Sequence, residues 1–248
     1  MCGRFAMSSE TDDLINEFVA EGGDFRDWRP GWNIKPTDTI PVVLESAKDG
    51  ADIVRRLEPA RWSLTPPWSK ELKTKFPTFN ARSEDITTKA SWKTPVKSHR
   101  ALVPASGYYE WQTDPVSKKK TPFYITNADG GTLAFAGLYS WWRDHSKADD
   151  DPTRWTLTAT ILTSGAVDEL LGIHDRNPVP LPHAWWDDWL DPTIEADQGF
   201  VDAAVQAALP IAGALEIREV APLPHDGDGP ELTEPVGTVR TGTPQDRS

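Results

Sequence analysis

The 248-residue sequence has little cysteine and no long apolar run. Its single cysteine excludes an internal disulfide and a multi-cysteine zinc site, so a metal would need histidine and carboxylate ligands. No apolar stretch approaches the roughly 18 residues of a membrane-spanning helix, which excludes an integral membrane protein of that kind. The first residues lack a basic stretch followed by an apolar core. We therefore expect no secretory signal, no membrane partner and a reducing, cytoplasmic location.

The chain also lacks an overall positive charge, since its formal net charge is -12. Taken alone, this value argues against a nucleic-acid partner. The charge is uneven, however: residues 1–60 carry a net -5, residues 61–143 a net +7 and residues 144–248 a net -14. Salt screens charges over about 8 Å, so a polyanion responds to the local potential. The basic middle block is therefore a candidate track for a nucleic-acid strand, with an ordinary solvated lysine face as the alternative.

Apolar spacing and turn residues predict an α+β fold with many short strands and few helices. Residues 10–21 have the spacing of a short amphipathic helix, and Asn127–Gly131 is typical of a hairpin turn. From residue 222 the chain is rich in glycine, proline and acidic residues and has little apolar content. We expect one domain over residues 1–221 and an acidic, flexible tail over residues 222–248. The other expected strands lie near residues 40–44, 53–57, 61–64, 101–103, 108–112, 123–125, 133–138 and 155–162, with a last strand at the end of residues 211–220. The other expected helices lie near residues 167–171, 184–190 and 200–208.

The most informative residue is Cys2. A small residue at position 2 permits removal of Met1, which leaves an α-amine and a thiol on the same residue. Near neutral pH part of the amine is uncharged and a few per cent of the thiol is thiolate. The amine condenses with an aldehyde to an imine, and the thiol then closes a five-membered thiazolidine ring. Cys2 is therefore a candidate aldehyde trap, unless it is an incidental terminal cysteine.

Six segments form a further pattern along the chain. They are residues 2–5 (CGRF), 62–68 (WSLTPPW), 79–84 (FNARSE), 103–111 (VPASGYYEW), 135–139 (FAGLY) and 172–178 (GIHDRNP). Each segment alone is a weak signal, but the ordered set with cysteine at position 2 is highly specific. The chain resembles, from Cys2 to about Pro182, the SRAP family (SOS response-associated peptidase), also called abasic-site processing proteins.

The resemblance implies a single SRAP-like domain with curved, mainly antiparallel, barrel-like sheets flanked by short helices. It also implies a protein of the DNA damage response that binds single-stranded DNA and joins its N-terminal cysteine to the aldehyde of an abasic site as a thiazolidine. Self-removal of Met1 and strand cleavage at abasic sites accompany this activity in the family. The expected partner is single-stranded DNA containing abasic sites, bound by a monomer that needs no cofactor and no metal and that associates with the nucleoid.

By motif position the resemblance assigns Cys2 as the nucleophile, with Asn80, Glu110 and His174 completing the site. A buried carboxyl such as Glu110 suits the proton transfers that open the sugar and expel water. His174 can move a proton near neutral pH, and the Asn80 amide can orient the α-amine. Each residue has an ordinary alternative. Glu110 can be the solvent-facing member of an alternating strand, His174 part of a surface turn, and Asn80 a turn residue.

The same segments supply candidate DNA contacts. Arg4, Arg82 and Arg176 fall within the motifs, and guanidinium groups bind phosphates well. Trp68 follows two prolines in a stiff loop that can present an indole to a base. We expect most other tryptophans to lie in the core or half-buried at the surface.

Three positions depart from the family pattern. Ser63 stands where the family usually has glycine, and Asn177 where it usually has methionine or arginine. The family's Val-Asn element near the C-terminus is not clear, and residues 220–224 are the nearest stretch. These departures leave the loop geometry and the C-terminal wall of the groove open.

Other interpretations remain open from the sequence. An N-terminal-nucleophile amidohydrolase, such as a glutaminase, also places cysteine after Met1, with the amine as base and the thiol as nucleophile. A single-strand binder with an inert Cys2 and a peptidase acting on other proteins are further alternatives. A metal enzyme using His174, Asp175 and His183 has a ligand spacing that matches no standard site.

Overall fold

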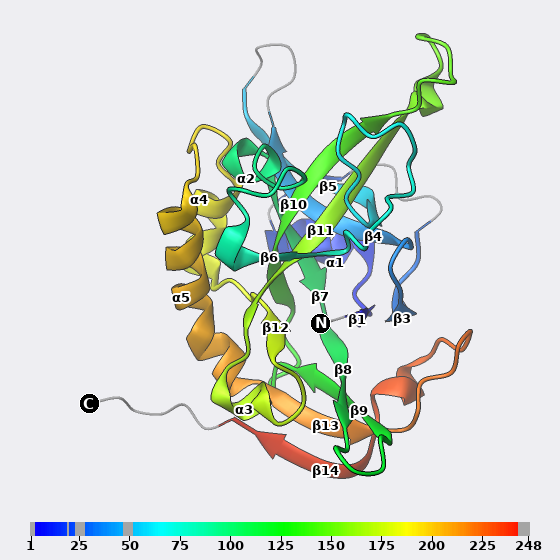
Figure 1. The fold of residues 1–248 in the computed structure, drawn as a ribbon, viewed down its shortest axis with the longest axis vertical. Coiled ribbons are helices and arrows are strands. Elements are labelled where there is room, and N and C mark those ends of the chain that lie inside the picture. Colours follow the sequence, from blue (N-terminus) through cyan, green and yellow to red (C-terminus); the bar gives the residue numbers. More distant parts are fainter. Residues whose placement is uncertain (1–2, 19, 23–27, 47–51, 243–248) are drawn as a thin grey trace.

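A computed structural model describes residues 3–18, 20–22, 28–46 and 52–242. Within these residues, strands form two sheets, and short helices and one longer helix lie at the outside of the molecule (Figure 1). The predicted α+β class, with mainly antiparallel, barrel-like sheets flanked by helices, is confirmed.

Five strands close into a barrel. They are β4 (Thr39–Ser46), β5 (Val54–Trp62), β7 (Arg100–Ala105), β10 (Leu133–Arg143) and β11 (Trp155–Gly165). Neighbours in the order β11-β10-β7-β4-β5 pair antiparallel, and β5 then pairs with β11 in parallel to complete the ring. All six residues of β7 are buried, because helix α4 (Trp186–Leu190) packs against this strand from outside the barrel. Three short strands extend the same sheet: β2 (Glu21–Gly22), β6 (Asn80–Arg82) and β12 (Arg176–Pro178).

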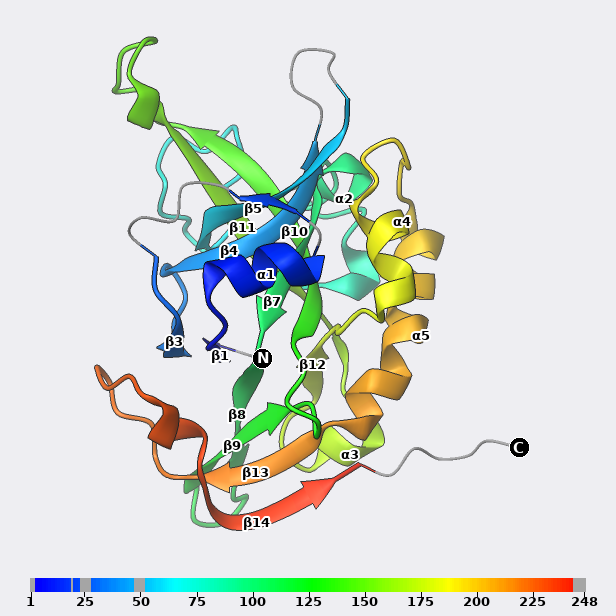
Figure 2. The same ribbon diagram turned by 180° about the vertical axis from the view of Figure 1, so that it is seen from behind.

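The second sheet has the strand order β14-β13-β9-β8-β1-β3, and all its pairings are antiparallel. Its strands are β1 (Arg4–Met7), β3 (Gly31–Ile34), β8 (Gly107–Thr113), β9 (Lys120–Thr126), β13 (Glu216–Val220) and β14 (Pro235–Thr241). In both views of the ribbon this sheet continues downward from the barrel, and β13 and β14 form its far edge (Figures 1 and 2).

The chain passes from the barrel to the second sheet at Ser106, between β7 and β8. The Ser106 amide donates to the carbonyl of Ala6 at 2.7 Å, and the Thr126 hydroxyl donates to the Ser106 carbonyl at 2.6 Å. The next residue, Gly107, has no room for a side chain, because a Cβ there would lie 2.5 Å from the Tyr124 ring. This close approach explains the glycine of the 103–111 motif and fixes the direction in which β8 leaves the barrel.

The helices cover the outside of the barrel. The amphipathic helix expected over residues 10–21 is confirmed, with the shorter bounds Thr11–Phe18 (α1), and Phe18 stacks on Trp186 at a ring distance of 4.4 Å. Asp197 caps the longest helix by accepting from the Phe200 amide at 2.9 Å. The other helices are α2 (Pro95–Ser98), α3 (Asp168–Leu171), α4 (Trp186–Leu190) and α5 (Gln198–Ala214), with 3₁₀ turns at Ser83–Asp85, Pro152–Arg154, His183–Trp185 and Pro230–Thr233.

Two expectations about the chain differ from the structure. The turn at residues 127–131 is present, but it is not a hairpin, because β9 before it and β10 after it belong to different sheets. The segment from residue 222, expected to be a flexible tail, contains β14, which pairs with β13. The prediction of a flexible tail rested on the overall composition of residues 222–248. It did not take into account the β-branched residues of β14, which favour a strand. The expected turn at 48–50 lies outside the described residues.

Candidate functional site

Glu110 lies in β8 and is only 6% exposed. Alternation along the strand puts Tyr108, Glu110 and Gln112 on one face. Tyr108 packs edge-on against Phe135 of the barrel strand β10, at a ring distance of 5.8 Å. Glu110 therefore lies on the same face of β8 as Tyr108, which packs against the barrel core. The alternative that Glu110 faces solvent is excluded.

The first described strand lies directly beside the strand that carries Glu110. β1 pairs antiparallel with β8, with Arg4 opposite Tyr109 and Phe5 opposite Tyr108. Cys2, two residues before Arg4 in the sequence, lies outside the described residues. The register of β1 nevertheless shows that the chain enters this strand next to the middle of β8.

Asn80, which is half-buried, is the first residue of β6 and pairs with Ile161 of β11. A chain of aromatic contacts fixes β6 relative to β1. The carbonyl of Phe79 accepts from the Trp62 indole at 2.8 Å, and Trp62 packs edge-on against Phe5 at 5.0 Å. Asn80 is thereby positioned by side chains that reach back to the first strand.

The loop that carries His174 is anchored at its base and at its tip. At the base, the Ala166 amide donates to the Asp175 carbonyl at 3.0 Å. The buried Asn177 accepts from the Val167 amide at 3.1 Å and donates to the Pro178 carbonyl at 2.6 Å. At the tip, the Gln112 amide donates to the carbonyl of Gly172 at 2.7 Å. The loop is thus attached to β8 two residues beyond Glu110.

The His174 ring has two contacts at its Nδ1 atom. The Arg176 amide donates to this nitrogen at 3.1 Å, and the Asp175 carboxylate lies 2.7 Å from it. One nitrogen cannot accept from the amide and donate to the carboxylate at once, so the tautomer of the ring decides which contact is a hydrogen bond. Nδ1 accepts from the amide when it carries no hydrogen, and it donates to Asp175 when it carries one.

Arg176 joins three elements through one guanidinium group. Its two terminal nitrogens donate to the two carboxylate oxygens of Glu84, each at 2.9 Å, and one of them also donates to the Thr163 carbonyl at 2.6 Å. Its Nε donates to the Thr163 hydroxyl at 3.3 Å. Partial burial raises the pKa of Glu84, but the hydrogen bonds and charge of Arg176 outweigh this effect and hold that pKa below its usual value. The Arg176 side chain thus joins the 3₁₀ turn Ser83–Asp85, β11 and β12, and its role as a DNA contact stays a prediction.

Arg4 contacts the C-terminal segment as well as its own sheet. One terminal nitrogen donates to the Asn33 side chain at 3.1 Å and to the Pro224 carbonyl at 3.2 Å. The Asn33 amide donates to the carbonyls of Pro224 at 3.2 Å and Gly227 at 2.7 Å. The guanidinium also lies over the Trp111 ring at 5.9 Å. Residues 224–228 therefore lie against β1 and β3 and form the C-terminal wall beside these strands. The sequence had not shown which segment forms this wall.

The two other predicted DNA contacts are at the surface. Arg82 ends β6 and is exposed, and Trp68 is 68% exposed in the loop between β5 and β6. The nearby departure Ser63 is buried, and its hydroxyl shares a hydrogen bond of 2.8 Å with Thr78 at the other end of that loop. Both side chains are exposed, and their role as DNA contacts stays a prediction.

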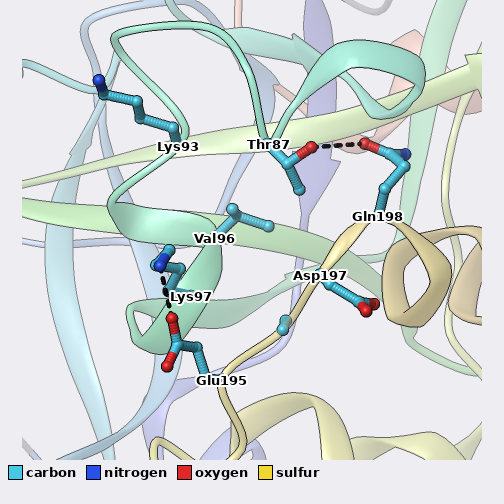
Figure 3. Close-up of a pocket in the computed structure, with 8 residues that line it drawn as sticks. Thr87, Lys93, Val96, Lys97, Glu195, Asp197 and Gln198 are labelled. Atoms are coloured by element: carbon cyan, nitrogen blue, oxygen red, sulfur yellow. Dashed lines mark hydrogen bonds and ion pairs between the residues drawn. The ribbon is translucent and has the colours of Figure 1, made fainter.

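A hollow of about 430 Å³ lies elsewhere, where α2 and the start of α5 meet. Its polar groups are largely paired with one another (Figure 3). Lys97 forms an ion pair with Glu195, and the Thr87 hydroxyl donates to Gln198 at 3.1 Å. None of the predicted site residues lines this hollow, so the candidate site lies elsewhere, around β1, β8, β6 and the His174 loop.

Two features are absent from the described part of the chain. No cluster of three histidine, cysteine or carboxylate side chains is placed to hold a metal ion there. Among the same residues, no helix is long and apolar enough to cross a membrane.

Reasoning from the sequence missed three residues that shape the site. Gln112 holds the His174 loop, Asn177 closes the base of that loop, and Asn33 holds the C-terminal wall. Gln112 and Asn33 bind main-chain atoms 60 and 194 positions away, and Asn177 binds the Val167 amide across its loop, so the local pattern gives no signal for these bonds. Only Asn177 carried a hint, since it departs from the family pattern within a motif.

Comparisons with known proteins agree with this architecture. The family model described as SOS response associated peptidase (SRAP) matches residues 1–223. The abasic site processing protein YoaM of Bacillus subtilis is 36% identical over 193 residues, covering 77% of this chain and 80% of that protein. YoqW of the same organism is 34% identical over 242 residues, covering 94% of this chain and 99% of YoqW.

Solved structures show the same fold. A protein from Bacteroides thetaiotaomicron has a TM-score of 0.74 at 18% identity, over 94% of this chain and 99% of that one. A phage-related protein from Bordetella bronchiseptica has a TM-score of 0.61 at 28% identity, over 88% of this chain and 94% of the other. On the extent of the family match and the identity to these relatives, the chain belongs to the SOS response associated peptidase (SRAP) family.

Proposed function

We propose that this protein captures abasic sites in single-stranded DNA by a covalent bond to Cys2, after removal of Met1. The observation that carries the proposal is the buried carboxyl group of Glu110, on the strand beside the one that the N-terminus enters. Burying a carboxyl group costs free energy, so a position of this kind favours a chemical role over an ordinary surface one. Relatives named abasic site processing proteins support the substrate.

The reaction begins at the ring-opened sugar of an abasic site, which exposes an aldehyde at C1′. The neutral α-amine of Cys2 adds to that carbon, and loss of one water molecule gives an imine. The Cys2 sulfur then adds to the imine carbon, and the nitrogen takes up a proton. The product is a five-membered thiazolidine that links the protein to the DNA, and the net change is the loss of one water.

The three other site residues manage protons and position. Glu110 protonates the ring oxygen as the sugar opens and regains a proton from the C1′ hydroxyl, and it later protonates the departing hydroxyl group and regains a proton from the Cys2 nitrogen. His174 exchanges a proton with the same groups, with Asp175 balancing its charge. The Asn80 amide orients the amine of Cys2 through its donor and acceptor atoms. None of these steps requires a cofactor or a metal.

The same groups give two further activities. In removal of Met1, the Cys2 thiol attacks the Met1 carbonyl and forms a thioester as the peptide bond breaks, and Glu110 protonates the freed amine. Water then cleaves the thioester, which releases methionine and restores the thiol. The imine can also act as an electron sink, so that loss of a C2′ proton expels the 3′ phosphate and cleaves the strand. We therefore propose autopeptidase and lyase activities for this site, within a monomer located in the cytoplasm at the nucleoid.

The strand is bound, in this proposal, by Arg82 and Arg4 at phosphates and by Trp68 at a base. The exposure of Arg82 and Trp68 supports these assignments. Arg176 is the remaining proposed phosphate contact, and it would have to bind DNA through donors that its bonds to Glu84 and Thr163 leave open.

The deciding experiment mixes the purified protein with an oligonucleotide that contains one abasic site and records intact mass. The expected product is the Met1-free protein plus the oligonucleotide minus one water. Cys2→Ala should give no heat-stable adduct, and Glu110→Gln should slow adduct formation. A heat-stable adduct with Cys2→Ala refutes the assignment of the nucleophile.

A parallel incubation with glutamine distinguishes the amidohydrolase alternative. Ammonia release that depends on Cys2, without an adduct to abasic DNA, would replace the proposal. An oligonucleotide without the abasic site serves as the control for specificity, because it offers phosphates and bases but no aldehyde.

A further inference from the structure

The loop between β5 and β6 contains a second aromatic side chain as exposed as Trp68. Phe76 is 78% exposed, and both rings line one hollow of about 670 Å³. Two exposed rings that line one hollow form an apolar patch, and an apolar patch rimmed by polar residues is typical of a binding site. The volume falls within the range of pockets that hold small organic ligands.

The charge around the hollow indicates the kind of ligand. Lys70, Lys73 and Lys75 line it, against the single acidic residue Glu71. Aromatic faces bind a planar apolar group, whereas ammonium groups bind a neighbouring anion. A nucleotide combines these features, with a base to stack on the rings and a phosphate to meet the lysines.

The hollow is built before any ligand arrives. The Thr65 hydroxyl donates to the Leu72 carbonyl at 2.7 Å, and the Thr74 hydroxyl donates to the carbonyl of Phe76 at 2.7 Å. The Trp142 indole of β10 donates to the Ser69 carbonyl at 2.9 Å and holds the loop on the barrel. A loop fixed in this way loses little conformational entropy on binding.

The position of the loop connects the hollow to the candidate site. The loop leads directly into β6, and Asn80 follows Phe76 by four residues. A strand whose lesion lies at Asn80 can therefore place a nearby nucleotide against Phe76. This step rests on the proposed function, because it takes single-stranded DNA as the ligand.

We propose that the hollow lined by Trp68, Phe76, Lys73 and Lys75 binds one nucleotide of the DNA strand that flanks the abasic site. The base stacks on the Phe76 and Trp68 rings, and the adjoining phosphates meet the lysines. The hollow thus acts as a subsite that holds the strand, separate from the residues that carry out the covalent chemistry.

The test measures non-covalent binding, by fluorescence anisotropy, of a labelled single-stranded oligonucleotide that has no abasic site. Phe76→Ala should weaken binding roughly 30-fold, the middle of the range for one base stacked on an aromatic ring. Phe76→Trp should bind with an affinity close to that of the wild type, because it keeps an aromatic ring at this position. Lys73→Gln and Lys75→Gln should each reduce the slope of log affinity against log salt by about 0.7. Trp155→Ala, which removes an exposed ring outside the hollow, is the matched control and should leave affinity unchanged.

A second arm identifies the bound nucleotide. Baseless tetrahydrofuran spacers are placed one at a time along the oligonucleotide, and each is combined with Phe76→Ala. One spacer position should weaken binding of the wild-type protein but have no further effect in the variant, because both changes remove the same contact. If no spacer position is coupled to Phe76→Ala, or if Phe76→Ala binds the oligonucleotide with unchanged affinity, the subsite is refuted. Saturable binding of free dAMP that depends on Phe76, with oligonucleotide binding unaffected, refutes the assignment to a DNA strand.

Failure of this inference can be distinguished from failure of the proposed function. If wild-type protein forms the abasic adduct and Phe76→Ala binds the intact strand equally well, only the subsite is wrong. If no adduct forms but Phe76 and one base are coupled, the hollow binds single-stranded DNA and the covalent chemistry is wrong. Because Phe76 is largely exposed, the urea midpoint of Phe76→Ala should equal that of the wild type, and a lower midpoint with unchanged affinity also counts against the subsite.

Discussion

Replacement of Arg176 by methionine separates a structural role of this side chain from a role in DNA binding. Methionine keeps much of the apolar stem and removes the guanidinium. The variant therefore loses two bonds to Glu84 and two bonds to Thr163. The Arg176 side chain is 11% exposed, whereas that of Glu84 is 54% exposed.

The loss of stability follows from these exposures. The bidentate pair with the mostly solvated Glu84 contributes about 1 kcal/mol after allowance for solvent screening. The bonds to Thr163 contribute about 1 kcal/mol each when the Thr163 groups are left without their donor. We expect Arg176→Met to lower the free energy of unfolding by about 2–3 kcal/mol. Glu84→Gln should cost only about 1 kcal/mol, because Arg176 keeps its bonds to Thr163.

The pH dependence of this loss has a definite sign. The folded-state pKa of Glu84 lies below its unfolded value, so the ion pair stabilises the protein fully above the unfolded pKa. This part of the stability is lost as the pH falls through the folded-state pKa. The difference in stability between wild type and Glu84→Gln should therefore be present at pH 7 and shrink in acid.

Urea unfolding followed by tryptophan fluorescence measures the stability, and the salt dependence of binding to single-stranded DNA measures the phosphate contacts. If the contacts of Arg176 in the fold are its main role, Arg176→Met loses stability and keeps the wild-type salt slope. Arg82→Met, in which the lost side chain is exposed, should show the reverse. Unchanged stability of Arg176→Met together with a slope reduced by about 0.7 would refute the structural role.

Three other predictions concern the fold that supports the site. Arg100→Met should lower the free energy of unfolding by about 4 kcal/mol in urea unfolding, because Arg100 is 1% exposed and its four hydrogen bonds to main-chain carbonyls would be lost, at about 1 kcal/mol each; a loss below 1 kcal/mol would contradict this. Gly107→Ala should lower the thermal midpoint and slow adduct formation, since its Cβ would lie 2.5 Å from the Tyr124 ring, and an unchanged midpoint would show that β8 can shift at no cost. Burial, and then the charge of Arg100, lower the pKa of His99 in the folded state. Because the unfolded state then binds more protons, the free energy of unfolding should decrease as the pH is lowered from 7.5 to 5.5. His99→Gln should flatten that fall in urea titrations, and an equally steep fall would assign it to other groups.

Local patterns in the sequence predicted the elements that depend on neighbouring residues. The 3.6-residue apolar period of α1 and the alternation around Tyr108 each follow from contacts that one face of an element makes. The exposure of Trp68 also followed from the two prolines before it. Such features need no knowledge of where the rest of the chain lies.

The features that the sequence did not predict depend on distant partners. The turn after β9 has the residues of a hairpin, but pairing of β9 with β13 and of β10 with β7 separates the two strands. β14 forms because β13 offers it an edge. Arg176 matched a phosphate-binding motif, while its partner Glu84 lies 92 residues away. For the candidate site, sequence motifs supplied the residues and only the structure supplied the loops that position them.

The contact between Arg4 and Pro224 also has a consequence for synthesis of the protein. The two residues are 220 positions apart, so the ribosome needs roughly 10–40 s to make the second after the first, at usual elongation rates. During this interval β1 lacks the segment that contacts its first arginine. Any reaction at the amino end during this interval therefore takes place before residues 224–228, which contact β1 and β3, have been translated.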